Sequence, residues 1–154
     1  MKKYRLLDND TKIFFGRKHF RIQALISFGD VKEGDLGGYI EKEENLAHEG
    51  NAWVSGDAQV YGNARVSGNA QVCGNARVSG NEDILCVKGI GSAFRHTTVC
   101  MTKSGEPFVS CGCFCGTLAE FEAKVKKTHG DSKYAREYQL FIELVKLHFD
   151  MEGA

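Results

Sequence analysis

Residues 52–81 read AWVSGD-AQVYGN-ARVSGN-AQVCGN-ARVSGN, which is the pattern Ala-x-Val-x-Gly-Asn/Asp written five times without a gap. A short repeat of fixed period is typical of a solenoid, in which each unit is too small to bury its own apolar face and stacks on the next. The Ala and the Val of each copy stand two positions apart, so both point to the same face of a strand. We therefore predict a solenoid lined by these alanines and valines, with Gly-Asn at its corners.

The pattern fades toward both ends of the repeat segment. Ile84 and Ile90 still fall on the valine positions downstream, whereas Lys42 and His48 occupy them upstream. From this spacing we expect about three coils. The predicted core ladders are Val54/Val72/Ile90 and Val60/Val78, within a repeat domain of residues 40–93.

Residues 1–39 are predicted to form a small β-meander that covers the open end of the solenoid. Strands are expected near residues 3–7 and 12–15, separated by a turn at residues 8–10, and a third strand is expected over residues 20–26, where apolar and polar residues alternate. A cap is needed because an open terminal coil exposes unpaired backbone groups.

Residues 94–154 are predicted to form a ββαα module. The hairpin is expected to turn at Ser104-Gly105 and to continue as one strand over residues 107–115. Thr117 and Glu120 form a capping-box pattern for a first helix, and Gly130 is placed to end it. Asp131 or Ser132 then caps a second helix that runs to about Phe149.

The second predicted helix carries two adjacent apolar stripes. One stripe consists of Tyr134, Tyr138, Phe141, Val145 and His148. The other stripe, for which so small a module offers no internal partner, consists of Leu140, Leu144 and Leu147. An exposed apolar stripe favours association, so we expect a homo-oligomer interface at these three leucines.

The repeat resembles the hexapeptide-repeat family, whose consensus places an aliphatic residue four positions before a small one, as Val66-Ser67-Gly68-Asn69-Ala70 does. The resemblance implies a left-handed parallel β-helix of triangular section with three hexads in each coil. It also favours a trimer, with a dimer through the helices as the alternative. The expected fold class is thus mainly β with a C-terminal α+β module, in which the β-helix is capped by the β-meander and the ββαα unit.

The chain also resembles a group of uncharacterised phage and prophage proteins that carry the same hexads between similar ends. The resemblance rests on Cys111-Gly112-Cys113-Phe114, Gly116-Thr117-Leu118, Phe121 and Thr128-His129-Gly130. It implies a phage accessory protein.

Composition excludes several classes of function. Twenty basic and twenty acidic side chains balance over 154 residues, so we expect no nucleic-acid partner, and Arg65 and Arg77 would interrupt the acidic stripe of a DNA mimic. No apolar run approaches the length of a membrane span. Asp8 and Asp10 interrupt the start of the chain before a signal peptide could form, so we expect six reduced cysteines and a cytoplasmic location in the bacterial host.

Three sets of residues are candidate sites. Gly91, Ser92, Arg95, His96, Thr97 and Thr98 cluster at the junction of the repeats and the C-terminal module, where they could hold a small anionic ligand. His48 is the candidate general base of an acyltransferase. Cys111, Cys113 and Cys115 alternate along one predicted strand, so their sulfurs share a face; Cys111 and Cys113 are the candidate metal ligands, although this spacing is poor for zinc. Cys111 with His129 is a conceivable nucleophile pair.

These observations lead to two hypotheses of different class. The first is a non-enzymatic, oligomeric phage protein without a cofactor, which blocks a host factor by binding a host protein or by sequestering an anionic or nucleotide ligand. The second is a hexapeptide-repeat acyltransferase. The short solenoid, the lack of a long catalytic loop projecting from the coils and the poor placement of His48 count against the acyltransferase, so binding is the expected function.

Overall fold

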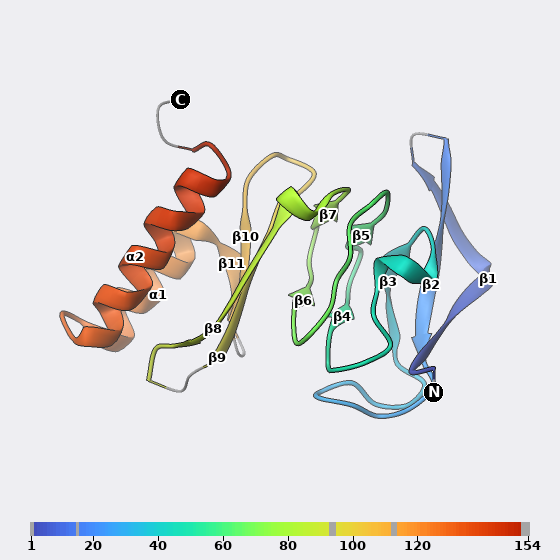
Figure 1. Ribbon diagram of the computed structural model, residues 1–154, viewed down its shortest axis with the longest axis horizontal. Coiled ribbons are helices and arrows are strands. Elements are labelled where there is room, and N and C mark those ends of the chain that lie inside the picture. The colour runs from blue at the N-terminus through green and yellow to red at the C-terminus, as the bar shows by residue number, and fades with distance from the viewer. Residues whose placement is uncertain (1, 15, 93–94, 112–113, 152–154) are drawn as a thin grey trace.

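The computed structural model of the chain describes residues 2–14, 16–92, 95–111 and 114–151. An N-terminal hairpin, a coiled segment, an antiparallel sheet and a pair of helices follow one another in chain order along the molecule (Figure 1). The first half contains β1 (Tyr4–Phe14), β2 (Arg17–Ala24), β3 (Leu36–Ile40), the short 3-10 helix η1 (Glu43–Asn45), β4 (Trp53–Val54), β5 (Gln59–Val60), β6 (Gln71–Val72) and β7 (Arg77–Val78). The second half contains η2 (Asn81–Asp83), β8 (Ile84–Ile90), β9 (Arg95–Cys100), β10 (Phe108–Cys111), β11 (Phe114–Thr117), α1 (Leu118–His129) and α2 (Lys133–His148).

The repeats form parallel coils, as the sequence predicts. β4 pairs with β6 and β5 pairs with β7, both in parallel, and the paired residues Trp53/Gln71 and Gln59/Arg77 stand eighteen positions, or three hexads, apart. The corner glycines Gly56, Gly62, Gly68 and Gly74 all have φ between 62° and 64°, a conformation that side chains with a Cβ rarely adopt. The alanines and valines of the hexads are buried in one apolar cluster.

The predicted ladders are confirmed for Val54/Val72 and for Val60/Val78. Ile90, however, does not extend the first ladder, because β8 pairs antiparallel with β9 and packs against the C-terminal core. Ile84 still packs against the coil core. After Val78 the chain therefore continues in antiparallel strands and does not form a further parallel coil.

Upstream of the repeats, the predicted register is wrong by two residues. Ile40 pairs with Val60 and Leu46 with Val66, so Ile40 and Leu46 hold the valine positions that we assigned to Lys42 and His48. The first coil contains two extra residues between Leu46 and Trp53, compared with the segment from Val66 to Gln71. Lys3 holds this longer corner, because its Nζ donates to the carbonyls of Ala52 (2.6 Å) and Gly50 (3.2 Å).

The N-terminal cap differs from the predicted meander in its strands and in its place beside the coils. Residues 8–10 do not form a turn, because β1 continues through them and pairs with β2 before and after an irregularity between Leu7 and Thr11. β2 then pairs antiparallel with β3, and β3 pairs in parallel with β5. The resulting sheet has the order β1-β2-β3-β5-β7, so the N-terminal hairpin extends the wall of the coils.

The C-terminal sheet has the strand order β11-β10-β9-β8, which is larger than the predicted two-stranded hairpin. β8 is an additional strand, and the single strand predicted over residues 107–115 is divided into β10 and β11, which pair antiparallel with Cys111 opposite Phe114. One face of the sheet contributes Cys100 and Ile84 to the coil core. The other face contributes Val99, Val109 and Cys111 to a second core beneath the helices.

The two helices begin and end where the sequence predicts. The Thr117 side chain accepts from the Glu120 backbone N–H (3.2 Å), and Glu120 accepts from the Thr117 N–H (2.9 Å), which completes the capping box. Gly130 ends α1, and Ser132 caps α2. Within the described residues, neither helix is long and apolar enough to cross a membrane.

Candidate functional site

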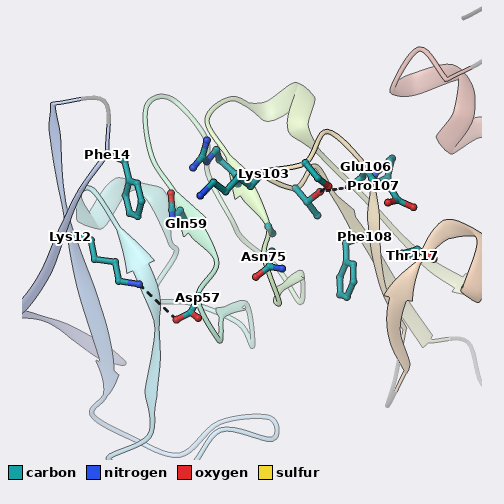
Figure 2. A pocket seen from close by; sticks show the side chains of 14 residues that line it. Lys12, Phe14, Asp57, Gln59, Asn75, Lys103, Glu106, Pro107, Phe108 and Thr117 are labelled. Carbon is teal, nitrogen blue, oxygen red and sulfur yellow. Dashed lines mark hydrogen bonds and ion pairs between the residues drawn. The ribbon is translucent and has the colours of Figure 1, made fainter.

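A groove with a volume of about 700 Å³ lies beside β5 and β7, between the N-terminal hairpin and the β9–β10 turn. Figure 2 shows Lys12 and Phe14 on one side of this groove, Gln59, Asn75 and Lys103 between, and Phe108 toward the other side. The other lining residues are Asp57, Ala76, Arg77, Thr102, Ser104, Glu106, Pro107 and Thr117.

The floor is built from outward positions of the hexads. The pairings Arg21/Tyr39, Tyr39/Gln59 and Gln59/Arg77 align these residues in one row across β2, β3, β5 and β7. The Arg77 guanidinium lies 5.9 Å from the centroid of the Phe14 ring. Within the described part of the chain, the Gln59 Oε1 atom is buried and has no hydrogen-bond partner.

The first wall, the end of β1, is held over the floor by a polar cluster. Arg21 Nε donates to Asp10 Oδ2 (2.8 Å), and the Tyr39 hydroxyl donates to Asp10 Oδ1 (3.0 Å). Lys12 Nζ lies 4.5 Å from the Tyr39 ring centroid and 4.0 Å from Asp57 Oδ1. Asp10 lies within the β1 irregularity between Leu7 and Thr11, and Lys12 lies just after it.

The second wall, the β9–β10 turn, is hydrogen-bonded to the last coil. The Arg77 N–H donates to the Met101 carbonyl (2.7 Å), and the Lys103 N–H donates to the Asn75 carbonyl (3.3 Å). The Thr102 hydroxyl donates to the Glu106 carbonyl at 2.6 Å. The Phe108 ring lies so close to Gly74 that a Cβ at that position would stand 3.1 Å from it. Floor and walls are thus tied together, which makes the groove a preformed site.

The charges in the groove favour an anion. Lys12, Arg77 and Lys103 line it together with two carboxylates, Asp57 and Glu106. Asp57 already lies near two cations, with Arg21 Nη2 at 3.9 Å in addition to Lys12. Among the described residues, Lys103 forms no ion pair, and its side chain is exposed.

Sequence reasoning missed this groove. The hexad pattern assigns Gln59 and Arg77 to the outside of the coil but gives no reason to single them out. Lys12 and Lys103 come from two hairpins far apart in the sequence, and no motif links them. The only signal was the alternation of Gln and Arg at the outward hexad positions.

The predicted anion-binding residues at the junction are divided between the two faces of the C-terminal sheet. His96 Nε2 lies 2.8 Å from the Asn69 amide nitrogen, and the Thr98 hydroxyl accepts from the Gln71 N–H (3.1 Å), so both side chains contact the coils. Thr97 points the other way and donates to Cys111 Sγ (3.2 Å) in the second core.

Gly91, at the same junction, is already engaged, because its N–H donates to Glu137 Oε1 (3.3 Å). Ser92 is exposed, and for Arg95 the structure describes the backbone alone. An anion at this junction stays a prediction, and it would have to compete with the Glu137 carboxylate.

His48 serves as a contact of the N-terminal cap. Its ring stacks on Tyr4 with 4.1 Å between centroids. Nδ1 accepts from the Lys3 N–H (3.2 Å), so Nε2 carries the proton and donates to Glu43 Oε1 (3.1 Å). A general base needs a free nitrogen lone pair, and this arrangement leaves none.

The candidate metal ligands and the leucine stripe also have defined places, except for Cys113, which lies outside the described residues. Cys111 faces the helices, whereas Cys115, predicted to share its face, lies near Cys73 on the coil side. No group of three or more described His, Cys, Asp or Glu residues could hold a metal ion.

Leu140, Leu144 and Leu147 are 68%, 47% and 67% exposed, respectively.

Comparison with known families supports the repeat. Residues 58–72 and 70–81 match the YdcK beta solenoid repeat, which covers the second to fifth hexads. None of the curated proteins matches the chain. The chain is therefore similar to β-solenoid proteins over its hexads, in agreement with the parallel pairing of its coils.

Proposed function

We propose that the protein is a non-enzymatic binding protein whose groove takes a small anionic ligand with a planar ring, such as a nucleotide. The observation that carries this proposal is the convergence of Lys12, Arg77 and Lys103 with Phe14 and Phe108 on one groove of about 700 Å³. This volume lies within the range of small-molecule sites. Guanidinium and ammonium groups bind phosphate through charge-assisted hydrogen bonds, and phenyl rings stack on planar ring systems.

Binding rather than catalysis is supported by the kinds of side chain in the groove. Its described lining contains hydroxyls, amides, cations and carboxylates but neither histidine nor cysteine. The Thr102 hydroxyl lies 3.0 Å from the Ser104 hydroxyl and donates to the Glu106 carbonyl, and neither hydroxyl has a histidine in that lining as its partner.

The wider setting of the proposal rests on the two resemblances. They support a left-handed coil, a homo-oligomer with a trimer favoured, and a phage origin. For a phage protein with this groove we propose a role in the host cytoplasm as an inhibitor of host defence that sequesters a nucleotide signal. The eighteen-residue spacing of the coils fits three hexads in each turn of such a β-helix. An experimental structure of the assembly tests both the hand and the oligomer.

The ligand is tested by thermal shift with linear and cyclic nucleotides, inorganic phosphate and acetyl-CoA. A ligand that binds only the folded state raises its melting temperature. We expect a rise with at least one nucleotide, and we expect Lys103→Glu to weaken its binding by about tenfold or more, because a charge-assisted contact becomes a repulsion.

Lys88→Glu is the matched control, since it makes the same change of charge at an exposed position of β8 outside the groove. It should bind like the unmodified protein. An equal loss of nucleotide binding in both variants would contradict the groove as the binding site. A panel in which no nucleotide raises the melting temperature would contradict it as well. Acetyl transfer in the presence of acetyl-CoA would favour the acyltransferase instead, and capture of a host protein alone would favour a protein-binding surface.

A further inference from the structure

Two thiols from distant parts of the chain lie next to each other where the coils meet the C-terminal sheet. Cys73 occupies a corner position of the fourth hexad, and Cys115 belongs to β11. Their Sγ atoms are 2.7 Å apart, although 42 positions separate them in the sequence. Cys115 is exposed and Cys73 is partly buried, so a small reagent can reach the pair from solvent.

The surrounding residues hold both thiols in place. Cys115 pairs with Ser110 across β10 and β11, and Ser110 also interacts with the Cys73 thiol. Beside Cys73, Gly74 packs on the Phe108 ring of the same sheet. The contact between the sulfurs is therefore part of the docking of the last coil onto the C-terminal sheet.

From this geometry we propose that Cys73 and Cys115 form a reversible disulfide when the protein meets a hydroperoxide. The exposed Cys115 thiolate attacks a peroxide oxygen, which yields a sulfenic acid and, for hydrogen peroxide, hydroxide that takes up a proton to become water. The Cys73 sulfur then displaces hydroxide from the Cys115 sulfur, and the thiol proton completes a second water. Overall, two thiols are oxidised by two electrons, and one peroxide is reduced to two waters.

The two thiols are suited to different steps. Burial and the neighbouring Cys115 raise the pKa of Cys73 to about 12, so Cys73 is protonated in the reduced protein and the exposed Cys115 is the thiol that meets the peroxide first. Cys86 and Cys100 lie on the same side of the sheet, but Cys100 is buried and the Cys86 Sγ contacts the Thr98 hydroxyl at 3.5 Å. Cys115 is thus the accessible partner of Cys73.

The disulfide would join the floor of the groove to its second wall, because Cys73 lies two positions before Asn75 of the floor and Cys115 lies in β11, which pairs with the strand that carries Phe108. It would also close a loop of about forty residues, which restricts the unfolded chain. The inference does not depend on the ligand of the groove.

Oxidation of the reduced full-length protein with equimolar hydrogen peroxide tests the proposal. Thiol titration of the denatured protein should fall from six groups to four, and trypsin should release residues 66–77, which contain only Cys73, joined to the peptide that carries Cys115. The melting temperature should rise by on the order of 5–10 °C and return on reduction.

Cys115→Ser should abolish both the cross-link and the rise, while Cys86→Ser, at another exposed cysteine, should change neither. Six remaining thiols, a cross-link that excludes Cys73, or disulfides only between chains would overturn the proposal.

Discussion

At the scale of single residues, His19 is the most unusual buried side chain. It is fully buried in β2, with the rings of Phe14 and Tyr61 edge-on at 5.3 Å and 5.1 Å. Within the described residues, neither ring nitrogen makes a hydrogen bond of good geometry. Burial lowers the pKa of His19, and the Arg17 backbone and Glu41 offset this only in part, while Arg17 and Arg77 add to it. The fold therefore holds His19 in its neutral form.

This environment predicts a loss of stability in acid. Below the unfolded-state pKa of about 6.5, the unfolded chain binds a proton at His19 that the folded chain refuses, so the free energy of unfolding falls as the pH falls. The contribution is at most about 1.4 kcal/mol per pH unit. Denaturant melts between pH 7 and pH 5 should show a smaller loss for His19→Phe than for the unmodified protein. The exposed His148→Gln serves as the control, and equal slopes for His19→Phe and the unmodified protein would contradict the assignment.

Val66 and Arg65 test the direction of the hexad side chains. Val66 is fully buried, whereas Arg65 is exposed one position away. Val66→Asp places an unpaired carboxylate in a core of alanine and valine, and we expect it to cost more than about 4 kcal/mol, enough to unfold the coils. Arg65→Asp should stay within about 0.5 kcal/mol of the unmodified protein. Thermal circular dichroism distinguishes the two, and an unchanged melt for Val66→Asp would show that the side chain does not face the core.

At the scale of elements, the sequence was most informative where one local rule decides the structure. The hexads predict the coil spacing, and Thr117, Glu120 and Gly130 predict the limits of α1. The rule failed at the first coil because its periodicity assumes no insertion. Two extra residues after Leu46 moved His48 out of the coil core, and only long-range contacts from Lys3 reveal how that corner is held.

The candidate groove could not be predicted for a related reason. Its floor follows from the hexads, but its walls come from β1 and from the β9–β10 turn, whose approach depends on tertiary contacts such as Arg21 with Asp10 and Arg77 with Met101. The same dependence explains the division of the cysteines. Alternation along one strand predicts that Cys111 and Cys115 lie on the same face of the sheet. Because Cys111 belongs to β10 and Cys115 to the antiparallel strand β11, they lie on opposite faces.

At the scale of the whole molecule, the C-terminal sheet lies between two separate cores. Its coil face completes the core of the hexads, and its other face covers Phe121, Tyr138 and Val145 of the helices. The sheet separates the two cores, so a substitution on the exposed side of α2 does not alter the packing of the hexads. The exposed leucine stripe of α2 belongs to neither core.

This separation sharpens the test of assembly. Leu140, Leu144 and Leu147 together expose an apolar stripe, and a second copy of the chain is the partner that we propose for it, because closed association hides such a surface. Leu144→Glu should reduce the mass measured by light scattering to that of a monomer while the circular dichroism of the coils stays unchanged. Gln139→Glu adds the same charge at an exposed position of α2 outside the stripe and should leave the assembly intact. A monomeric mass for the unmodified protein at micromolar concentration would show that the stripe is not a contact between copies.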